Sequence, residues 1–311
     1  MTTGEAGMIS QVAGLGQAIG LPFELKTVNP RAPWRWLPGH WAARMGVLAS
    51  LDSNDGIHPP WPDLLITCGR RSVAAAIAIK NASGGRTFTV HIQDPRVPPT
   101  CFDMVVPPEH DRLRGANVFP TRGALHKLTR EALAHAAERF TDAFKAVRKP
   151  FVAVLIGGKS RSYDLTAARM RELAMQLKEL AAKHGAGLVV STSRRTGAEN
   201  ETILRDALAD TDAMVWDGTG ENPYLAMLAM ADLIIVTEDS ASMVSEACYT
   251  GRPVYVAKLE GRSRRFDALH KSLEDAGFTR PFNGKLETWQ YAPLDENQRI
   301  AAIVRERMAR R

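Results

Sequence analysis

The chain has 311 residues, of which 45% are hydrophobic and 24% charged, a composition that is typical of folded globular proteins and excludes a wholly disordered one. Its length favours two domains of roughly 150 residues each over a single hydrophobic core. The net charge of +6 suits an anionic partner of unspecified kind. The three cysteines lack short pair spacing, which argues against a zinc site or a disulfide framework and predicts a reducing, cytoplasmic setting.

The first residues lack the charged and apolar segments of a secretory signal. A glycine-containing loop at 2–7 leads into a helical pattern at 10–19, with no strand before it. The glycines within 14–20 resemble a dinucleotide-binding fingerprint, but that fingerprint needs a strand directly before it. We therefore disfavour an NAD-dependent sugar epimerase and expect no cofactor.

Tryptophan and arginine are interleaved in the segment 31–48, which contains Trp34, Trp36 and Trp41. This composition suits peripheral contact with the inner face of a membrane, or with a lipid-linked acceptor. A pair of helices packed over a sheet explains the same residues and is the interpretation we prefer. Nothing in the segment indicates nucleic acid as a partner.

Short apolar runs between amphipathic segments predict βαβ units, and hence a parallel sheet, in the first half of the chain. A helix is expected at 71–80. The strands are expected at 63–67, 86–92, 102–106 and 116–119.

The loops that follow these strands hold candidate general bases. Asp94, His110, Asp111 and His126 lie there, and a carboxylate or an imidazole can take a proton from an acceptor hydroxyl. Each also has a structural alternative, since Asp94 could stabilise the turn before Pro95 and His126 could be a packed, hydrogen-bonded histidine.

A helical pattern at 129–147 ends at Lys149–Pro150, because proline disfavours helical backbone in the residue before it. We place the domain boundary there, which gives an N-terminal domain of residues 1–149 and a C-terminal domain of residues 150–294. Apolar residues at helical spacing near the C-terminus predict a helix that docks back on the first domain, so 295–311 is assigned to it. Strands of the second domain are expected at 151–156, 187–191, 213–216, 233–236 and 253–256.

The longest apolar stretch, 224–236, is interrupted by Asp232 and is shorter than the ~20 residues that cross a bilayer. No membrane-spanning segment is expected.

Two polar loops of the second domain carry basic side chains that could neutralise a diphosphate. Glycine would let a ligand approach the first loop closely. A Walker A loop is rejected, because Ala153 stands where that motif needs a glycine. Loops at the carboxyl ends of parallel strands are expected to converge on a ligand, although a solvated charged turn would explain the arginines as well. The residues concerned are Gly157, Gly158, Lys159, Ser160 and Arg161 in the first loop and Arg194 and Arg195 in the second.

A third polar loop runs from the strand at 233–236 into a helix. Its backbone N–H groups and the hydroxyls of Ser240 and Ser242 could bind a diphosphate. Glu246, about one and a half turns into the helix, could accept hydrogen bonds from ribose hydroxyls. The alternative is that Asp239 or Ser240 only caps the helix.

Metal ligation is not expected. Asp210 and Asp212 resemble an Asp-x-Asp motif but precede their strand, which favours a helix-terminating turn. No other histidine or carboxylate cluster has metal-ligand spacing.

The run from Asn222 through Glu246 to Val254 resembles the plant elongated-mitochondria (mitochondrial fission) protein family and its bacterial GT-B glycosyltransferase-like members. The segments 92–96, 108–111 and 123–126 extend the resemblance over nearly the whole chain. It implies an α/β, GT-B-like fold with two Rossmann-like parallel-sheet domains facing a central cleft. Family members commonly have a histidine in the first glycine loop, where this chain has Met8.

The resemblance also implies roles for the two domains, with the donor nucleotide on the second and the acceptor on the first. Glu246 would hold the ribose and Ser240 and Ser242 the diphosphate. Asn222, Asp239 and Met243 belong to the same donor-binding run. The leading hypothesis is a metal-independent glycosyltransferase that uses a nucleotide-diphosphate sugar. A non-catalytic scaffold of the same fold is the alternative, and Met8 favours it.

Overall fold

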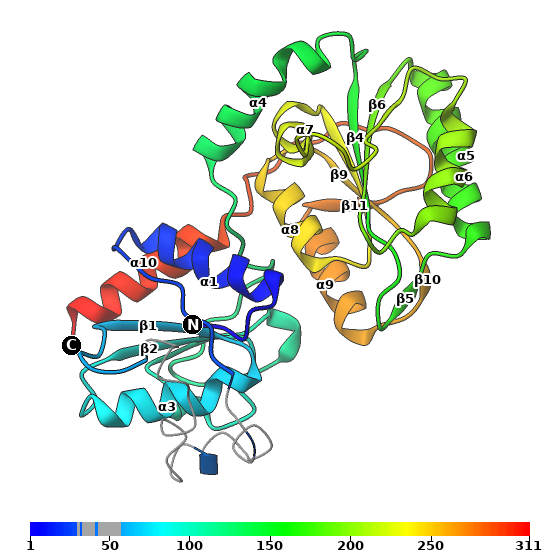
Figure 1. The fold of residues 1–311 in the computed structure, drawn as a ribbon. Coiled ribbons are helices and arrows are strands. Elements are labelled where there is room, and N and C mark those ends of the chain that lie inside the picture. Colours follow the sequence, from blue (N-terminus) through cyan, green and yellow to red (C-terminus); the bar gives the residue numbers. More distant parts are fainter. Residues whose placement is uncertain (30–31, 33–40, 43–56) are drawn as a thin grey trace. The chain divides into compact units, whose positions relative to one another are not determined.

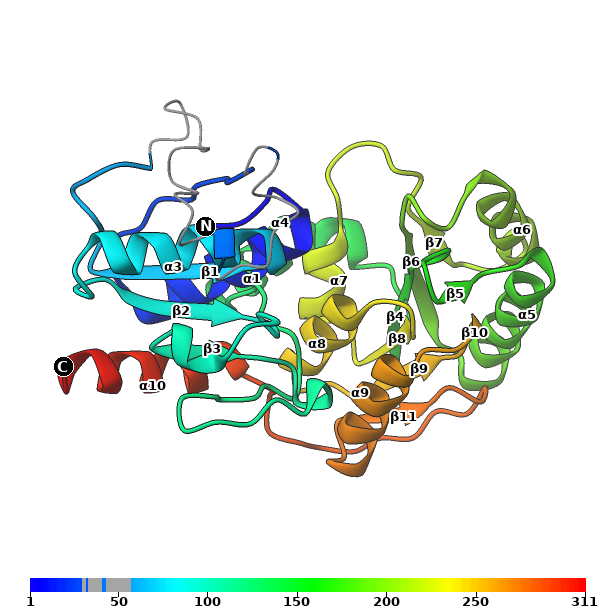
Figure 2. The same cartoon turned by 90° about the horizontal axis from the view of Figure 1, so that it is seen from below.

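The computed structural model describes residues 1–29, 32, 41–42 and 57–311. Contacts divide the chain into two compact units, each with a parallel sheet and helices (Figures 1 and 2). Unit 1 comprises Met1–Lys127 and Asp295–Arg311, and unit 2 comprises Leu128–Leu294.

Unit 1 has a three-stranded parallel sheet in the order β1-β2-β3. Helices α1 and α10 pack against each other over one face of the sheet, and α3 covers the other face (Figure 1). Three of the four strands predicted for this half of the chain are confirmed. The elements are α1 (Ala6–Ile19), β1 (Leu64–Cys68), α3 (Val73–Ala82), β2 (Phe88–Ile92), β3 (Met104–Val106) and α10 (Glu296–Ala309).

The strand predicted at 116–119 is wrong. Only one parallel bridge, between Val118 and Val105, joins this segment to the sheet. The Asn117 side-chain amide donates hydrogen bonds to the carbonyl oxygens of Pro99 (2.8 Å) and Phe102 (2.9 Å), which ties the segment to a neighbouring loop. Pro120 then lacks the N–H that a longer ladder would need.

Unit 2 has a six-stranded parallel sheet in the order β11-β9-β8-β4-β6-β7 and a small antiparallel ribbon of β5 and β10. Its elements are α4 (Arg130–Phe144), β4 (Phe151–Ile156), β5 (Tyr163–Asp164), α5 (Ala167–His184), β6 (Gly187–Thr192), α6 (Ala198–Leu208), β7 (Met214–Val215), α7 (Tyr224–Met230), β8 (Leu233–Thr237), α8 (Ala241–Tyr249), β9 (Val254–Ala257), β10 (Glu260–Gly261), α9 (Arg264–Asp275) and β11 (Thr279–Pro281).

Helices cover both faces of the unit 2 sheet, which explains why its strands are apolar almost without interruption. Alternate residues of β4 serve the two faces, as the two-residue period of a strand requires. Ala153 and Leu155 join a cluster with α4, α7 and α8, whereas Val152 and Val154 join a cluster with α5 and α6.

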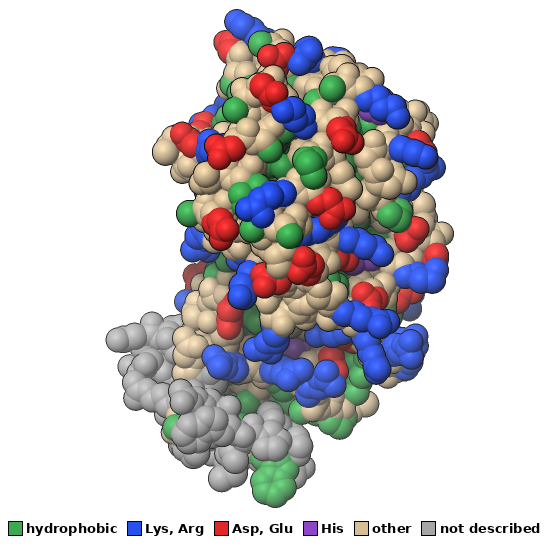
Figure 3. All heavy atoms as spheres, turned by 90° about the vertical axis from the view of Figure 1, so that its right-hand side faces the viewer, with side chains coloured by type: hydrophobic (Ala, Val, Ile, Leu, Met, Phe, Trp, Pro, Cys, Tyr) green, Lys and Arg blue, Asp and Glu red, His purple; other side chains and the backbone are tan. Residues whose placement is uncertain are grey.

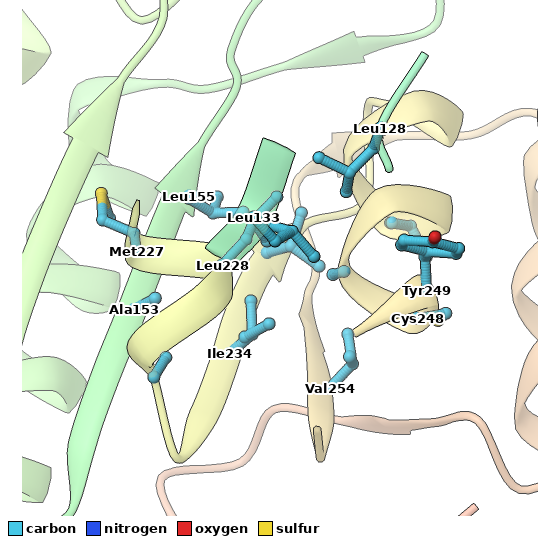
Figure 4. Packing of buried hydrophobic residues seen from close by; sticks show 14 of the residues in the cluster. Leu128, Leu133, Ala153, Leu155, Met227, Leu228, Ile234, Cys248, Tyr249 and Val254 are labelled. Carbon is cyan, nitrogen blue, oxygen red and sulfur yellow. The ribbon is translucent and has the colours of Figure 1, made fainter. Parts of the chain in front are cut away.

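The unit boundary lies at Lys127–Leu128 and differs from the boundary expected at Lys149–Pro150. Helix α4 packs against α7, and Figure 4 shows Leu128 and Leu133 in one cluster with Leu228. The apolar face of α4 therefore belongs to the core of unit 2. Proline 150 follows the helix but does not mark the division between cores.

Helix α10 completes unit 1. Its Ile300, Ala301 and Val304 have no exposed surface and lie in the same cluster as Leu15 of α1. Close packing also explains Gly14, where a Cβ atom would come 2.0 Å from the carbonyl oxygen of His126. Gly14 thus allows α1 to pack closely against the loop at His126 and against Asn297 of α10.

On the face drawn in Figure 3, lysine and arginine side chains are interspersed with aspartate and glutamate, and several basic side chains gather in the lower part of the view. Trp41 is exposed, and Trp34 and Trp36 lie outside the described residues. In the part of the chain that the structure describes, no helix is long and apolar enough to cross a membrane.

Candidate functional site

The candidate donor site of unit 2 lies where the order of the sheet reverses around β4. The chain passes from β4 to β6 on one side and later returns to β8 on the other. Residues near the carboxyl ends are paired, Ile156 with Thr192 and Leu155 with Val236. The three polar loops predicted from the sequence therefore start side by side, where ligands bind in open α/β sheets.

Asp239 joins these loops. Its side chain has no exposed surface, and its carboxylate accepts hydrogen bonds from the Gly158 N–H (3.1 Å) and the Thr237 hydroxyl (2.6 Å). Nη1 of Arg195 lies 2.7 Å from the same carboxylate. The Thr237 oxygen in turn accepts the Gly157 N–H at 2.8 Å. Asp239 was expected to contact the donor, but in the structure its carboxylate organises the loops.

Gly157 and Gly158 make room for protein atoms. A Cβ atom on Gly157 would lie 2.2 Å from a carboxylate oxygen of Asp239, and one on Gly158 would lie 2.1 Å from the carbonyl oxygen of Arg195. Both glycine N–H groups already have acceptors within the protein. The prediction that a ligand approaches the backbone at these two glycines is therefore wrong, because atoms of neighbouring loops occupy that position.

The loop after β6 is tied to the loop after β4 through hydroxyl groups. Ser193 and Thr196 donate hydrogen bonds to the Gly157 carbonyl oxygen, at 3.1 and 2.5 Å. The Lys159 N–H also donates to the Arg195 carbonyl oxygen at 3.0 Å. No local sequence pattern indicates these roles of Ser193 and Thr196, because their partner lies more than 35 residues away along the chain.

Basic side chains surround this junction. Lys159, Arg161 and Arg194 are exposed, and Nζ of Lys159 lies 3.9 Å from Asp164. Arg195, whose side chain is 40% exposed, is held by Asp239. The junction thus presents positive charge to solvent from a backbone that is fixed from within.

The predicted hydroxyl ligands divide into two groups. Ser160 accepts the N–H groups of Ser162 and Tyr163 and so stabilises its own loop. Ser240 is the N-cap of α8 and accepts the Met243 N–H at 3.3 Å, which is the capping alternative. Ser242, in the first turn of α8, is half-buried.

Glu246 is paired with Tyr224, a contact across 22 residues that no sequence motif indicates. The Tyr224 hydroxyl donates to Oε2 of Glu246 at 2.5 Å. Burial, and then the charge of Glu246, raise the pKa of Tyr224 well above its usual value, so the hydroxyl remains a donor. Asn222, two residues before α7, accepts the N–H of Tyr224, the first residue of that helix, at 2.9 Å.

The loop between β8 and α8 is also held from α9. Nε2 of His270 donates to the Glu238 carbonyl oxygen at 2.9 Å, and burial lowers the pKa of this histidine. The Glu238 carboxylate accepts the Leu259 N–H at 2.6 Å, and burial raises its pKa. No motif in the sequence pointed to His270.

The candidate bases of unit 1 lie at the carboxyl end of its sheet, but in different surroundings. Asp94 accepts the Arg96 N–H (2.8 Å) and pairs with Nε of Arg96 (3.0 Å), so it stabilises its turn as the structural alternative predicted. Nε2 of His110 lies 3.9 Å from Asp111, and both side chains are largely buried.

His126 is buried, and its backbone bridges two helices. It accepts a hydrogen bond from Asn297 of α10 and packs against Gly14 of α1. The prediction that His126 is an accessible general base is wrong, because only 3% of the residue is exposed.

Met8 packs at the same edge of the sheet. A Cβ atom on Gly69, whose φ is +90°, would lie 2.5 Å from the Met8 sulfur. The side chain at position 8 therefore contacts the end of β1. Among the described residues, no three His, Cys, Asp or Glu side chains are grouped to hold a metal ion.

The chain matches a known protein family and shares its fold with solved structures. The family model described as "Mitochondrial fission ELM1" matches residues 6–308. The mitochondrial fission protein ELM1 of Arabidopsis thaliana is 32% identical over 277 residues, which cover 80% of this chain and 65% of the plant protein. The match thus spans less than two thirds of that relative.

Two solved structures share the fold at 14% identity. UDP-GlcNAc 2-epimerase of Methanocaldococcus jannaschii, in complex with UDP-GlcNAc and UDP, gives a TM-score of 0.54 over 96% of both chains. MurG of Acinetobacter baumannii gives 0.51 over 100% of this chain and 91% of MurG. The shared architecture is GT-B-like, with two Rossmann-like parallel-sheet units.

Proposed function

The chain belongs to the mitochondrial fission ELM1 family, and from this premise we propose that unit 2 binds a nucleotide-diphosphate sugar whose sugar is transferred to an acceptor. The observation that carries the proposal is the junction of three loops that Asp239 holds together. Exposed basic side chains lie around this junction, and the Glu246–Tyr224 pair lies on helices α8 and α7. We expect the protein to act in the cytoplasm.

The diphosphate is assigned to the junction. Negative charge builds up on the leaving nucleotide during glycosyl transfer, and preorganised positive charge lowers the barrier. Lys159, Arg161 and Arg194 would supply that charge, with the start of α8 behind Ser240. Since side chains can balance the leaving group, the proposal requires no metal.

The ribose is assigned to Glu246. A carboxylate can accept hydrogen bonds from both ribose hydroxyls. Tyr224 holds one carboxylate oxygen and fixes the side-chain orientation. This arrangement favours a ribonucleotide over its deoxy analogue.

We assign the base for the acceptor hydroxyl to His110. Nε2 of His110 lies 3.9 Å from the Asp111 carboxylate, which is close enough to attract the imidazole and limit its orientations. Asp94 is already paired with Arg96, and His126 is buried.

Met8 supports a second candidate function, a non-catalytic scaffold that keeps nucleotide binding. The methionine stands where the family commonly has histidine and packs on Gly69 at the candidate acceptor edge. A protein of this kind would bind nucleotide and show no transfer to any acceptor.

The test is a calorimetric titration with UDP, UDP-GlcNAc and the deoxy analogue of UDP. A bound nucleotide at 100 times its dissociation constant should also stabilise the protein by about 2.7 kcal/mol in thermal unfolding. Glu246→Gln and Tyr224→Phe should each weaken binding of the ribonucleotide roughly tenfold or more, because hydrogen bonds to a charged group contribute about 1.5–3 kcal/mol.

Glu179→Gln is the matched control, since Glu179 is exposed on α5. It should leave the affinity unchanged. Equal affinity of all variants for UDP and its deoxy analogue would reject the ribose assignment. Absence of binding to any nucleotide diphosphate would reject the donor site itself.

A further inference from the structure

Arginines gather at the carboxyl end of the unit 1 sheet. The strands of this sheet end in register, with Cys68 beside Ile92 and Ile92 beside Val106. The loops that follow therefore leave the sheet at the same edge. They carry Arg70 and Arg71 after β1, Arg96 after β2, and Arg112 and Arg122 after β3.

Two of these arginines are balanced by carboxylates of the same edge. Arg96 pairs with Asp94, and Nε of Arg122 lies 3.7 Å from Glu109. The loops after β2 and β3 thus contribute little net charge from these pairs.

The other arginines leave the edge positive. Within the described ranges, Arg70 and Arg112 are exposed and form no ion pair. Arg71 is also exposed. Its charge interacts with Glu5 through space: a hydrogen bond from Thr3 is the largest cause that lowers the pKa of Glu5, and the charge of Arg71 lowers it further. Among the described residues, the guanidinium groups of Arg70 and Arg112 therefore face solvent without an ion-pair partner.

The backbone at this edge is held in costly conformations. Gln93, Arg96 and Arg112 have φ values of +81°, +58° and +54°, and they are the non-glycine residues with positive φ in the described part of the chain. Such conformations cost free energy and concentrate at functional sites. Here they fix the loops that carry Arg96 and Arg112.

The chemistry of the edge selects for phosphate. Guanidinium presents a planar fork of donors that matches phosphate oxygens, whereas lysine acts as a point charge. Helix α1 begins near this edge at Ala6, after the N-cap residue Glu5, and its first turn has no side-chain cap and no acidic residue. Met8 of this turn lies beside Gly69. The N-terminal end of the helix dipole adds positive potential, which the Glu5 carboxylate partly offsets.

We propose that this edge is the acceptor site of the transferase and that the acceptor carries a phosphate or diphosphate group, which Arg70, Arg71 and Arg112 bind. The acceptor role rests on the proposed function, but anion binding at the edge is measurable without it. The phosphate could belong to a soluble molecule or to a lipid.

The first probe is inorganic pyrophosphate, titrated into the full-length protein and followed by calorimetry and hydrogen exchange. We expect slower exchange in segments 69–72 and 107–112. Arg70→Gln combined with Arg112→Gln should weaken pyrophosphate binding about tenfold or more, since two charge-assisted contacts are lost.

The matched control changes the same charge at the opposite end of the sheet, with Arg86→Gln and Arg310→Gln combined. Arg86 precedes β2 and bonds the Ser83 carbonyl oxygen, and Arg310 bonds Glu306 on its own helix. This control should retain pyrophosphate affinity within about twofold, because surface substitutions have small effects.

The second probe distinguishes the sources of the phosphate. Co-sedimentation with phosphatidylcholine vesicles that contain phosphatidate, lost in the Arg70 and Arg112 variant, would assign a lipid phosphate. Pyrophosphate binding without vesicle binding would assign a soluble one, and both results support the proposal. The proposal is overturned if the Arg70→Gln and Arg112→Gln variant binds pyrophosphate and the vesicles as tightly as the wild type. It is also overturned if pyrophosphate slows hydrogen exchange only in the unit 2 loops. If pyrophosphate slows hydrogen exchange in residues 69–72 but the protein binds no nucleotide diphosphate, the proposed transferase function is rejected and the anion site is supported.

Discussion

At the scale of single residues, Asp239 shows how one buried carboxylate can hold several loops. Its oxygens receive the Gly158 N–H, the Thr237 hydroxyl and the Arg195 guanidinium from three different segments. The exposed basic side chains on those segments depend on this arrangement for their position. Asp239 therefore affects both stability and binding without being exposed.

Asp239→Asn should lower the free energy of unfolding by about 2 kcal/mol, because a neutral amide cannot balance Arg195 or accept all the same hydrogen bonds. Urea unfolding measures the effect. The control is Asp210→Asn, which removes an exposed pair with Lys178 at 2.7 Å and should leave the free energy of unfolding nearly unchanged, because solvent screens exposed ion pairs. Similar losses for both variants would show that the junction does not depend on the buried charge.

A second residue-scale prediction concerns pH. Burial lowers the pKa of His91 to about 3, and its Nδ1 bonds the Thr67 hydroxyl at 2.8 Å. The unfolded chain takes up this proton near pH 6.5 and the folded protein does not. The stability associated with neutral His91 is therefore complete above pH 6.5 and is lost as pH falls toward 3.

Between pH 7 and pH 5 the wild type should lose about 2 kcal/mol more unfolding free energy than His91→Asn, which keeps a donor for Thr67 and does not titrate. Chemical denaturation at both pH values tests this. His135→Asn, at an exposed position on α4, should follow the wild-type curve. Parallel curves for wild type and His91→Asn would contradict the assignment.

At the scale of elements, close packing in unit 1 depends on where α1 lacks side chains. Gly14 and Gly7 lie on the same helix in opposite surroundings. A Cβ atom on Gly14 meets the His126 carbonyl oxygen and the Asn297 amide, while one on Gly7 meets nothing within 4 Å. The contact between α1, α10 and the loop at His126 thus depends on a single position.

Gly14→Ala should destabilise the protein by about 2 kcal/mol or more, because the added methyl group overlaps backbone that cannot move freely. Gly7→Ala should leave stability unchanged or raise it by up to about 1 kcal/mol, through the better helix propensity of alanine. Thermal or urea unfolding of the two variants separates the cases. Equal stability of both variants would mean that the helices can move apart at no cost.

The sequence predicted most strands because buried apolar runs are local features, as in β4 and β8. It failed where the deciding partner is distant. The Asn117 amide bonds a loop 15–18 residues away, and the apolar face of α4 looks the same whichever core it joins. The polar loops of the donor site could be predicted from their place after strands. The bond between Gly158 and Asp239 crosses 81 residues and the bond between Tyr224 and Glu246 crosses 22, so neither leaves a local pattern.

At the scale of the whole molecule, the chain passes between units twice, at Lys127–Leu128 and at Leu294–Asp295. Unit 1 is therefore discontinuous in sequence and unit 2 is continuous. The α10 residues Ile300 and Val304 lie in the unit 1 core with no exposed surface.

A chain cut after Leu294 should lose the structure of unit 1 and keep that of unit 2, because the uncovered face of α1 and the sheet would be exposed to water. Hydrogen exchange should increase across β1, β2 and β3 and remain slow in β4 and β8. Limited proteolysis should then yield a resistant fragment that begins near Leu128. Protection of β1 to β3 in the cut chain would show that α10 is dispensable.

The discontinuity of unit 1 has a consequence for biosynthesis. The ribosome makes the first part of this unit, then all of unit 2, and only then α10. Bacterial and eukaryotic ribosomes add about 5–20 residues per second, so the nascent chain waits on the order of ten seconds for the helix that covers Leu15 and Ile92. During that interval unit 2 can fold while the older half of the polypeptide still displays an apolar surface, which makes the nascent chain a client for chaperones that recognise exposed hydrophobic segments.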